Sequence, residues 1–209
     1  MPTVLRRAPQ QARGRQRIDT ILDAAEQILA EAGYEAVTTN AIAARARTSI
    51  GSLYQFFPNK DAILNALGLR YFDRCRSMFA PYLLPDAAAL PMEEWIDGIV
   101  DTLDTVQQSL VGFKEMFCNA ALPELADADN AMHRQYVSGL DGVLARRAPG
   151  LAPERRMVCA ELCVRTAEKL MSLLGESTGE RRALVLAEIK SLLAAYMGRL
   201  VAERPAGGT

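Results

Sequence analysis

The chain has 209 residues, of which 50% are hydrophobic, and its 24 Lys and Arg nearly balance its 25 Asp and Glu, for a formal net charge of −1. This length is enough for one or two domains with a sizeable core. No apolar run approaches the ~18 residues of a membrane-spanning helix, and no apolar stretch of a secretory signal follows the first arginines. We therefore expect a cytoplasmic protein with no membrane partner and with reduced cysteines, which are Cys75, Cys118, Cys159 and Cys163.

The charge is unevenly distributed along the chain. Residues 1–60 contain eight Lys and Arg against five Asp and Glu, whereas residues 61–209 contain sixteen against twenty. Residues 1–17 include five arginines and no acidic side chain. We expect residues 1–14 to form a disordered basic arm, which attracts nucleic-acid phosphates without reading sequence. A solubilising tail is the alternative for a basic terminus considered by itself.

An amphipathic helix is predicted from Ile18 to Ala32, because apolar residues recur there at i, i+3, i+4 and i+7. Gly33 follows it and can adopt the left-handed conformation that ends many helices. This helix would pack over the next two and complete a three-helix unit.

Two short helices are predicted next, at Thr38–Ala46 and at about Ile50–Phe57, joined by a corner of three residues that starts at Arg47. A β-hydroxyl accepts a hydrogen bond from a free amide of the first helical turn. We therefore expect Thr38 or Thr39 to cap the first helix and Ser49 to cap the second. Two helices of this length with a short corner match the helix-turn-helix, whose second helix lies in the major groove of DNA.

The remaining chain contains further helical patterns separated by breaks, with no alternating strand pattern, so the predicted fold class is all-α. Asn59 is expected to cap a long helix from Lys60 to about Phe79, and three prolines within residues 80–91 predict a turn. The other predicted elements are a helix along Trp95–Leu110, a short apolar piece at Phe113–Ala121, a break at Leu122–Asn130, and helices at Met132–Arg147, Pro153–Leu174 and Glu180–Glu203.

A gapless set of positions between residues 13 and 67 forms a distinctive pattern: Arg17, Ile21, Leu22, Ala24, Ala25, Gly33-Tyr34, Thr38, Ile42-Ala43, Ala46, Gly51-Ser52-Leu53-Tyr54, Phe57 and Lys60. Together these residues resemble the N-terminal domain of TetR-family transcriptional regulators. The resemblance implies a helix-turn-helix DNA-binding domain over residues 15–60, a helical ligand-binding and dimerisation domain over 61–204, and a tail at 205–209.

Roles within the helix-turn-helix follow from side-chain chemistry and from the family pattern. Hydroxyl or ammonium donors at helix ends are expected to hold DNA phosphates, and Gly51 to let the second helix approach the DNA backbone closely. Arg47 stands where the family often has glycine, and left-handed geometry there would cost about 1 kcal/mol, in exchange for a phosphate contact. The phosphate candidates are Thr39, Tyr54 and Lys60, and the candidates for base edges or thymine methyls are Asn40, Ser49, Ile50, Ser52 and Gln55.

The last two predicted helices, within residues 154–174 and 180–203, are apolar on more than one side. Their apolar arcs are wider than the ~100° stripe that a helix needs to pack on its own core. A thick internal core is one explanation. The TetR resemblance favours a homodimer through these helices, whose two recognition helices would reach half-sites of a double-stranded operator about 34–36 Å apart.

The resemblance also implies a cavity for a small-molecule effector between the central helices. Few charges fall on the stripes there, so the effector is expected to be apolar or aromatic, although each lining candidate is also a plausible core residue. The candidates are Phe72, Phe79, Trp95, Ile99, Phe113, Phe117, His133 and Tyr136.

Enzymatic patterns are missing from the sequence. The single histidine leaves no zinc ligand set, and neither a Gly-rich phosphate loop nor a nucleophile with an ordered base is present, so we expect no catalytic residue, metal or cofactor. Cys159 and Cys163 lie one turn apart and are interpreted as buried hydrophobes rather than sensors.

The function predicted from the sequence is a ligand-responsive, homodimeric transcriptional repressor, with repression implied by the family. The alternatives are a DNA-binding regulator controlled by a protein partner, by its own level or by redox chemistry instead of a small effector, and a helical interaction protein.

Overall fold

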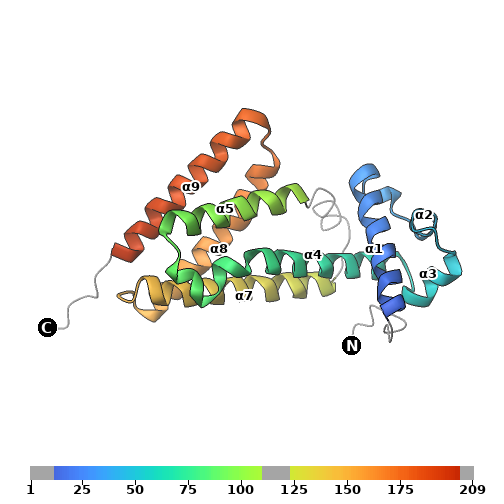
Figure 1. Cartoon of the computed structure of the whole chain (residues 1–209), viewed down its shortest axis with the longest axis horizontal. Coiled ribbons are helices and arrows are strands. Elements are labelled where there is room, and N and C mark those ends of the chain that lie inside the picture. Colours follow the sequence, from blue (N-terminus) through green and yellow to red (C-terminus); the bar gives the residue numbers. More distant parts are fainter. Residues whose placement is uncertain (1–11, 110–122, 203–209) are drawn as a thin grey trace. The chain divides into compact units, whose positions relative to one another are not determined.

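The computed structural model describes residues 12–109 and 123–202, and every regular element in these ranges is helical (Figure 1). This confirms the predicted all-α class. None of the described helices is long and apolar enough to cross a membrane. The helices are α1 (Ala12–Ala32), α2 (Thr39–Arg45), α3 (Ile50–Phe56), α4 (Lys60–Leu83), α5 (Met92–Ser109), α7 (Pro123–Arg147), α8 (Pro153–Gly175) and α9 (Gly179–Ala202), with short 3₁₀ turns η1 (Tyr34–Ala36) and η2 (Pro85–Ala89).

The chain divides into two compact units, each made from two separate stretches of sequence. Among the described residues, the first contains 12–73 and 123–129, and the second contains 74–109 and 130–202. Both α4 and α7 therefore contribute residues to both units, and the first unit continues past the boundary expected at residue 60.

The core of the first unit is the predicted three-helix arrangement, in which α1 packs on α2 and α2 on α3 (Figure 1). The apolar stripe of α1 is buried, and Ile42, Leu53 and Phe57 of the following segment are fully buried. Gly33 ends α1 at φ 75°, in the left-handed region, and its N–H donates to the Leu29 carbonyl at 3.1 Å. The arrangement of α1, α2 and α3 is therefore determined by residues that lie close together in the sequence.

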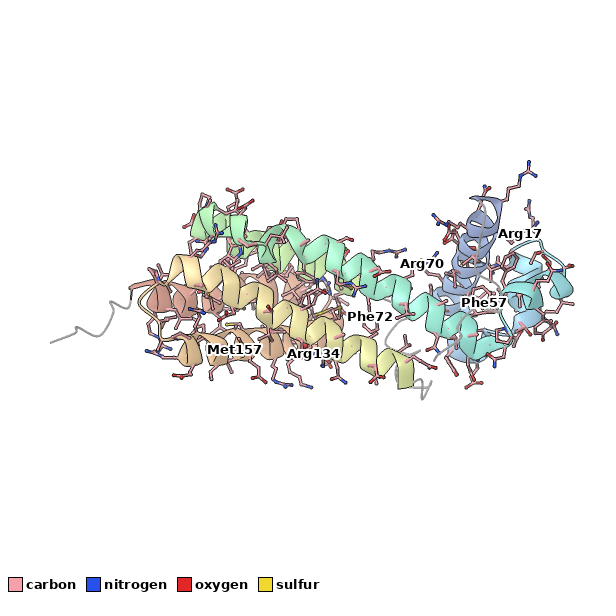
Figure 2. All side chains as sticks on the ribbon, turned by 90° about the horizontal axis from the view of Figure 1, so that it is seen from below. Arg17, Phe57, Arg70, Phe72, Arg134 and Met157 are labelled. Atoms are coloured by element: carbon pink, nitrogen blue, oxygen red, sulfur yellow. The ribbon has the colours of Figure 1, made fainter. Side chains whose placement is uncertain are left out.

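The first half of α4 is fixed to α1 by a cluster of polar groups. Arg70 reaches across from α4 (Figure 2), with Nη1 2.6 Å from Asp23 Oδ1 and Nη2 2.5 Å from Glu26 Oε2. The Tyr71 hydroxyl donates to the other oxygen of Glu26 at 3.1 Å. As predicted, Asn59 caps α4, because its side-chain oxygen accepts the Ala62 N–H at 2.9 Å.

The break predicted at residues 122–130 is wrong in the described part, because α7 begins at Pro123. Proline is tolerated in the first turn of a helix, where its missing N–H would have no intrahelical partner. The first turn is also anchored on α4. Glu124 accepts a hydrogen bond from Asn65 Nδ2 at 2.8 Å, and the buried Leu125 side chain lies against Gly68, where a β-carbon would collide with it. The polar segment is thus the exposed side of a docked helix.

The turn predicted at residues 80–91 begins later than expected. Helix α4 continues through Pro81 to Leu83, and the Leu84 N–H still donates to the Ala80 carbonyl at 3.1 Å. The proline sits in the last turn of the helix, so the chain leaves helical geometry soon after it. The turn η2 then fills part of the predicted break.

In the second unit, α5 packs on both α8 and α9, and α8 packs on α9 (Figure 1). Ion pairs fix the register of α9 on α5: Lys190 Nζ lies 3.1 Å from Asp97 and 2.9 Å from Asp101, and Arg182 lies 2.5 Å from Asp104. These contacts are made by one side of α9, which leaves the opposite side without a partner from the described chain.

Candidate nucleic-acid interface

The corner between α2 and α3 is shaped by two hydroxyl caps. The Thr38 side chain accepts the Ala41 N–H at 3.1 Å, and the Ser49 side chain accepts the Ser52 N–H at 3.1 Å. Of Thr38 and Thr39, the two threonines expected as alternative caps, Thr38 is therefore the one that caps α2. Because Ser49 Oγ accepts one hydrogen bond at the cap, its hydroxyl hydrogen and one acceptor lone pair remain to meet a base edge.

Arg47 adopts the left-handed conformation that the sequence analysis considered for this position, with φ at 49°. It is the non-glycine residue with a positive φ among those described. Its N–H donates to Ala44 O at 3.2 Å and the next N–H, of Thr48, to Ala43 O at 3.0 Å, so two bonds fix the strained corner. The Arg47 side chain is exposed, and the strain costs about 1 kcal/mol that a glycine would avoid.

The outer face of α3 is exposed and includes apolar groups. Ile50 and Tyr54 are both exposed, whereas Leu53 is completely buried on the opposite face. Gln55 is exposed and Ser52 half-buried. A β-carbon added at Gly51 would meet nothing within 4 Å, so packing within the described chain does not require glycine there. This face therefore exposes polar and apolar side chains to solvent.

The start of α2 lies beside this face. The Thr39 and Tyr54 hydroxyls are 3.3 Å apart, close enough for a hydrogen bond in either direction, and Asn40 is exposed next to them in sequence. The structure thus brings together two of the three groups that we expected to hold phosphates.

The third such group, Lys60, is anchored elsewhere in the unit. Its ammonium donates to the Tyr34 carbonyl at 3.2 Å and lies 3.9 Å from the centre of the Tyr34 ring. Burial raises the pKa of the Tyr34 phenol, which keeps that ring neutral. An ammonium has three N–H donors, so Lys60 keeps donors available for a phosphate.

The arginines that the structure describes in the first unit fall into two groups. Arg45 and Arg70 are paired with carboxylates on α1, the former at 2.7 Å from Glu31. The others have no carboxylate partner among the described residues; they are Arg13, Arg15, Arg17 and Arg47. The first three lie on α1, which begins at Ala12, inside the segment expected to be a disordered arm. Residues 1–11 of that segment lie outside the described residues.

Among the residues expected to contact an effector, Trp95 is held by the protein itself. It is 1% exposed, its indole Nε1 donates to the Tyr82 carbonyl at 2.8 Å, and the Arg147 guanidinium lies 4.6 Å from its ring centre. Arg147 also donates to the carbonyls of Ala87 and Leu90 at 2.8 and 2.7 Å. This arrangement is that of a core residue with its polar tip satisfied.

A different pair has the features expected of an effector contact. The rings of Phe79 and Tyr136 meet edge to face with centroids 5.4 Å apart. The Tyr136 hydroxyl is buried and has no hydrogen-bond partner among the described residues. Burial raises the pKa of Tyr136, so this hydroxyl is a neutral donor.

The remaining effector candidates are dispersed. Phe72 is buried in the first unit, and Ile99 is half-buried in the second. His133 Nδ1 lies 2.7 Å from Glu168 Oε1, which ties α7 to α8. Phe113 and Phe117 lie outside the described residues.

The outer faces of α8 and α9 carry exposed apolar side chains. Val158 on α8 is 64% exposed and Leu184 on α9 is 63% exposed, in a part of the chain whose other face is well packed. Figure 2 marks Met157 on the same helix as Val158. The exposed large apolar residues of the two helices are Met157, Val158, Leu162, Leu184, Leu192 and Val201.

The described cysteines, Cys75, Cys159 and Cys163, are buried. Burial raises the pKa of Cys163 to about 12 and that of Cys75 to about 11. Thiolate is the reactive form, so the raised pKa lowers the reactivity of Cys75 and Cys163. Cys118 lies outside the described residues, and no group of three or more His, Cys, Asp or Glu in the described part could hold a metal ion.

Sequence reasoning missed one contact at the corner. Arg17 Nη1 donates to the Thr48 hydroxyl at 3.0 Å, joining α1 to the residue before the α3 cap (Figure 2 marks Arg17). Arg17 was part of the sequence pattern, but nothing local pairs it with a residue 31 positions away.

Comparisons with known proteins match both halves of the chain. A family model for the tetracyclin repressor-like C-terminal domain matches residues 91–197, and one for bacterial regulatory proteins of the tetR family matches residues 21–67. The chain is 48% identical over 61 residues to the HTH-type transcriptional repressor KstR of Mycolicibacterium smegmatis and 40% identical over 63 residues to that of Rhodococcus jostii. These alignments span only 29% and 30% of the two repressors, and equal shares of this chain.

Solved structures match over most of the chain. A TetR-family transcriptional regulator from Streptomyces coelicolor is 28% identical with a TM-score of 0.61, over 88% of this chain and 99% of that one. A transcriptional regulator from Rhodococcus sp. Rha1 shares the fold with a TM-score of 0.67 at 18% identity, over 88% and 95% of the two chains.

Proposed function

Because this chain belongs to the TetR family of transcriptional regulators, we propose that it is a repressor that binds a palindromic DNA operator as a homodimer and is released by a small apolar or aromatic molecule. The family regulates transcription and is not a family of enzymes. Repression is supported by the local identity with the KstR repressors. The proposal that α3 reads DNA is supported by its exposed outer face, where Ile50 and Tyr54 are exposed and the space beside Gly51 is open.

On this proposal α3 enters the major groove and α2 crosses the backbone. Thr39 and Tyr54, which lie 3.3 Å apart, hold phosphates and set the register, together with Lys60. The base-reading groups are Asn40, Ser49, Ile50, Ser52 and Gln55. Ile50 is suited to a thymine methyl, and Gln55 to the paired donor and acceptor of adenine.

Gly51→Ala tests DNA reading directly. A β-carbon there meets nothing within 4 Å of the protein, and alanine favours helix over glycine by up to ~1 kcal/mol, so the melting temperature should rise. On DNA the same methyl would separate α3 from the backbone that it approaches, so operator affinity should fall at least about tenfold. The operator is first selected from random duplexes with the natural protein, and affinity is then measured by fluorescence anisotropy.

The matched control is Gly142→Ala on α7, where an added β-carbon also meets nothing within 4 Å. It should raise stability similarly and leave operator affinity unchanged. If Gly51→Ala binds the selected operator as tightly as the natural protein, α3 does not lie in the groove as proposed. If the selection yields no palindrome, with Ser52→Ala and Tyr54→Phe equally without effect, the operator proposal itself fails.

We propose that the homodimer forms through the exposed apolar residues of α8 and α9. A two-fold axis presents the same patch on both subunits, so the patch must be self-complementary, and two apolar helix faces per subunit make a four-helix interface. Half-sites one helical turn of DNA apart, about 34–36 Å, then follow from the symmetry. The contacts of α9 with α5 through Lys190 and Arg182 support this, since they direct its other side outward.

The effector is proposed to bind in the second unit near Tyr136 and Phe79. A buried hydroxyl without a partner is costly, and a ligand with a hydrogen-bond acceptor on an apolar body would satisfy it. Effector binding would favour a conformation with lower operator affinity, as a population shift. A redox-controlled regulator is disfavoured, because burial raises the pKa of the Cys163 thiol to about 12.

Tyr136→Phe should therefore stabilise the free protein while weakening the effector response. Removing a buried hydroxyl that has no partner in the described part of the chain should stabilise the protein by about 1 kcal/mol, measured by thermal denaturation. In a screen of apolar and aromatic compounds, any that releases the natural protein from its operator should be needed at about tenfold higher concentration with the variant. A variant that melts lower than the natural protein would show that the hydroxyl has a partner of its own.

A further inference from the structure

We propose that Arg17, held in place by Thr48, binds a phosphate of the operator backbone at the corner of the helix-turn-helix, and that Arg47 binds at the same corner. This inference rests on the proposed DNA-binding function and adds α1 to the DNA-contacting surface. It starts from the contact between Arg17 Nη1 and Thr48 Oγ1, which are 3.0 Å apart.

The charge distribution of the first unit identifies the corner as an anion site. Two of the arginines away from it are neutralised, because Arg45 pairs with Glu31, and Arg70 pairs with Asp23 and Glu26, whereas Arg13 and Arg15 precede the corner residue Arg17 on α1. Arg17 and Arg47 are exposed and have no carboxylate partner among the described residues. Two guanidinium groups without a carboxylate partner among the described residues therefore meet at this corner. Arg17 is hydrogen-bonded to Thr48, and Arg47 directly precedes Thr48 in the chain. Together they favour a bound anion there.

The hydrogen bond to Thr48 pre-positions the guanidinium. A guanidinium has five N–H donors in a planar fork, so the bond to one hydroxyl leaves the others free for phosphate oxygens. Thr48 is the residue before Ser49, the cap of α3. The fork is therefore fixed relative to the reading helix, and a phosphate bound by it would set the register of α3 on the bases. Part of the ordering cost of a long side chain is already met in the free protein.

The conformation of Arg47 is a second, independent observation. Its φ of 49° costs about 1 kcal/mol, and it makes no ion pair within the described residues that would offset the cost. Strained backbone persists where the residue has a function that an unstrained substitute would lose. A phosphate contact made by the Arg47 side chain is such a function, since glycine would relieve the strain but carry no charge.

The test compares Arg17→Ala with Arg15→Ala on the selected operator over a series of salt concentrations. Arg15 is a matched control: it has the same charge, is exposed on the same helix, and lies two residues away, on the opposite side of the helix. Arg17→Ala should weaken operator binding about tenfold and reduce the slope of log affinity against log salt by about one. Arg15→Ala should change both much less.

Two further variants separate charge from geometry. Thr48→Val keeps the shape of the side chain but removes the acceptor, so it should weaken binding a few-fold without changing the salt slope. Arg17→Lys keeps the charge, so it should restore the slope but not the full affinity, because an ammonium lacks the planar fork. Arg15→Ala and Arg17→Ala are both expected to have the melting temperature of the natural protein, since neither side chain is buried.

Equal losses for Arg15→Ala and Arg17→Ala would overturn the inference, because only total charge would then matter. An unchanged affinity for Thr48→Val would overturn the positioning role of Thr48. These outcomes differ from failure of the proposed function, in which the natural protein itself would select no operator.

Discussion

Glutamate substitutions at Leu162 on α8 and Leu184 on α9 are expected to disrupt the homodimer proposed above and to leave the protein monomeric. The two side chains are 53% and 63% exposed in the single chain, and burying a leucine is worth about 1.5–3 kcal/mol. Under two-fold symmetry each substitution acts twice, and each adds a carboxylate whose desolvation costs several kcal/mol more. The monomer should be seen by size-exclusion chromatography with light scattering at micromolar concentration.

The matched control is Leu84→Glu, at a leucine that is 56% exposed but lies on neither α8 nor α9. This variant should remain dimeric. The monomeric double variant should lose at least about 100-fold in operator affinity, because a monomer contacts one half-site, while its helical content stays unchanged. A double variant that remains a dimer would show that another surface pairs the subunits.

Trp95→Ala is expected to destabilise the protein by about 3–5 kcal/mol, the range for removing a large buried aromatic side chain. The substitution removes the cover of Arg147 and the hydrogen bond from Nε1 to the Tyr82 carbonyl. It would leave a cavity at the point where α5 meets the turn before it. Urea denaturation followed by circular dichroism measures the loss.

The expected contrast is with Ile99→Ala, one turn further along α5 at a half-buried position, which should cost less. Trp95→Phe should fall between the two, because it retains the ring packing and loses the donor. If Trp95→Ala unfolds at nearly the natural urea concentration while operator release by an effector is lost, Trp95 faces the effector, as the sequence analysis expected.

The first three helices could be predicted from sequence because their signals are local. Hydroxyl caps at Thr38 and Ser49, the glycine after α1 and the buried spacing of Leu53 and Phe57 lie within a few residues of what they determine. The exposed positions of Ile50 and Tyr54 follow from the same helical spacing.

The contacts that join α4 to its neighbours could not be predicted. Asn65 and Glu124 are 59 residues apart, and Arg70 and Asp23 are 47 apart, so no local pattern pairs them. The segment at 122–130 has the composition of a loop, yet it is helical from Pro123, and the contact of Leu125 with Gly68 that stabilises this helix is not visible in the local sequence.

The sequence could not distinguish effector-contacting residues from core residues, for a different reason. An aromatic residue on a helix stripe has the same pattern whether it faces a ligand or another helix. Trp95 and Tyr136 differ only in what their polar atoms meet: the indole has the Tyr82 carbonyl, and the phenol has no partner among the described residues. That difference is a property of the folded chain and not of the sequence pattern.

The discontinuous first unit has a consequence for how the protein is made. In this unit Glu124 contacts Asn65 of α4, and Leu125 lies against Gly68 of α4. Asn65 and Glu124 are 59 residues apart in the sequence. At elongation rates of about 5–20 residues per second, the ribosome needs roughly 3–12 s to supply the second stretch after the first. During that interval the DNA-binding helices can form, while the side of α4 that Leu125 later covers remains open to water and to chaperones. A fragment that ends at residue 73 would keep that surface exposed permanently, so we expect it to aggregate more readily than the full chain.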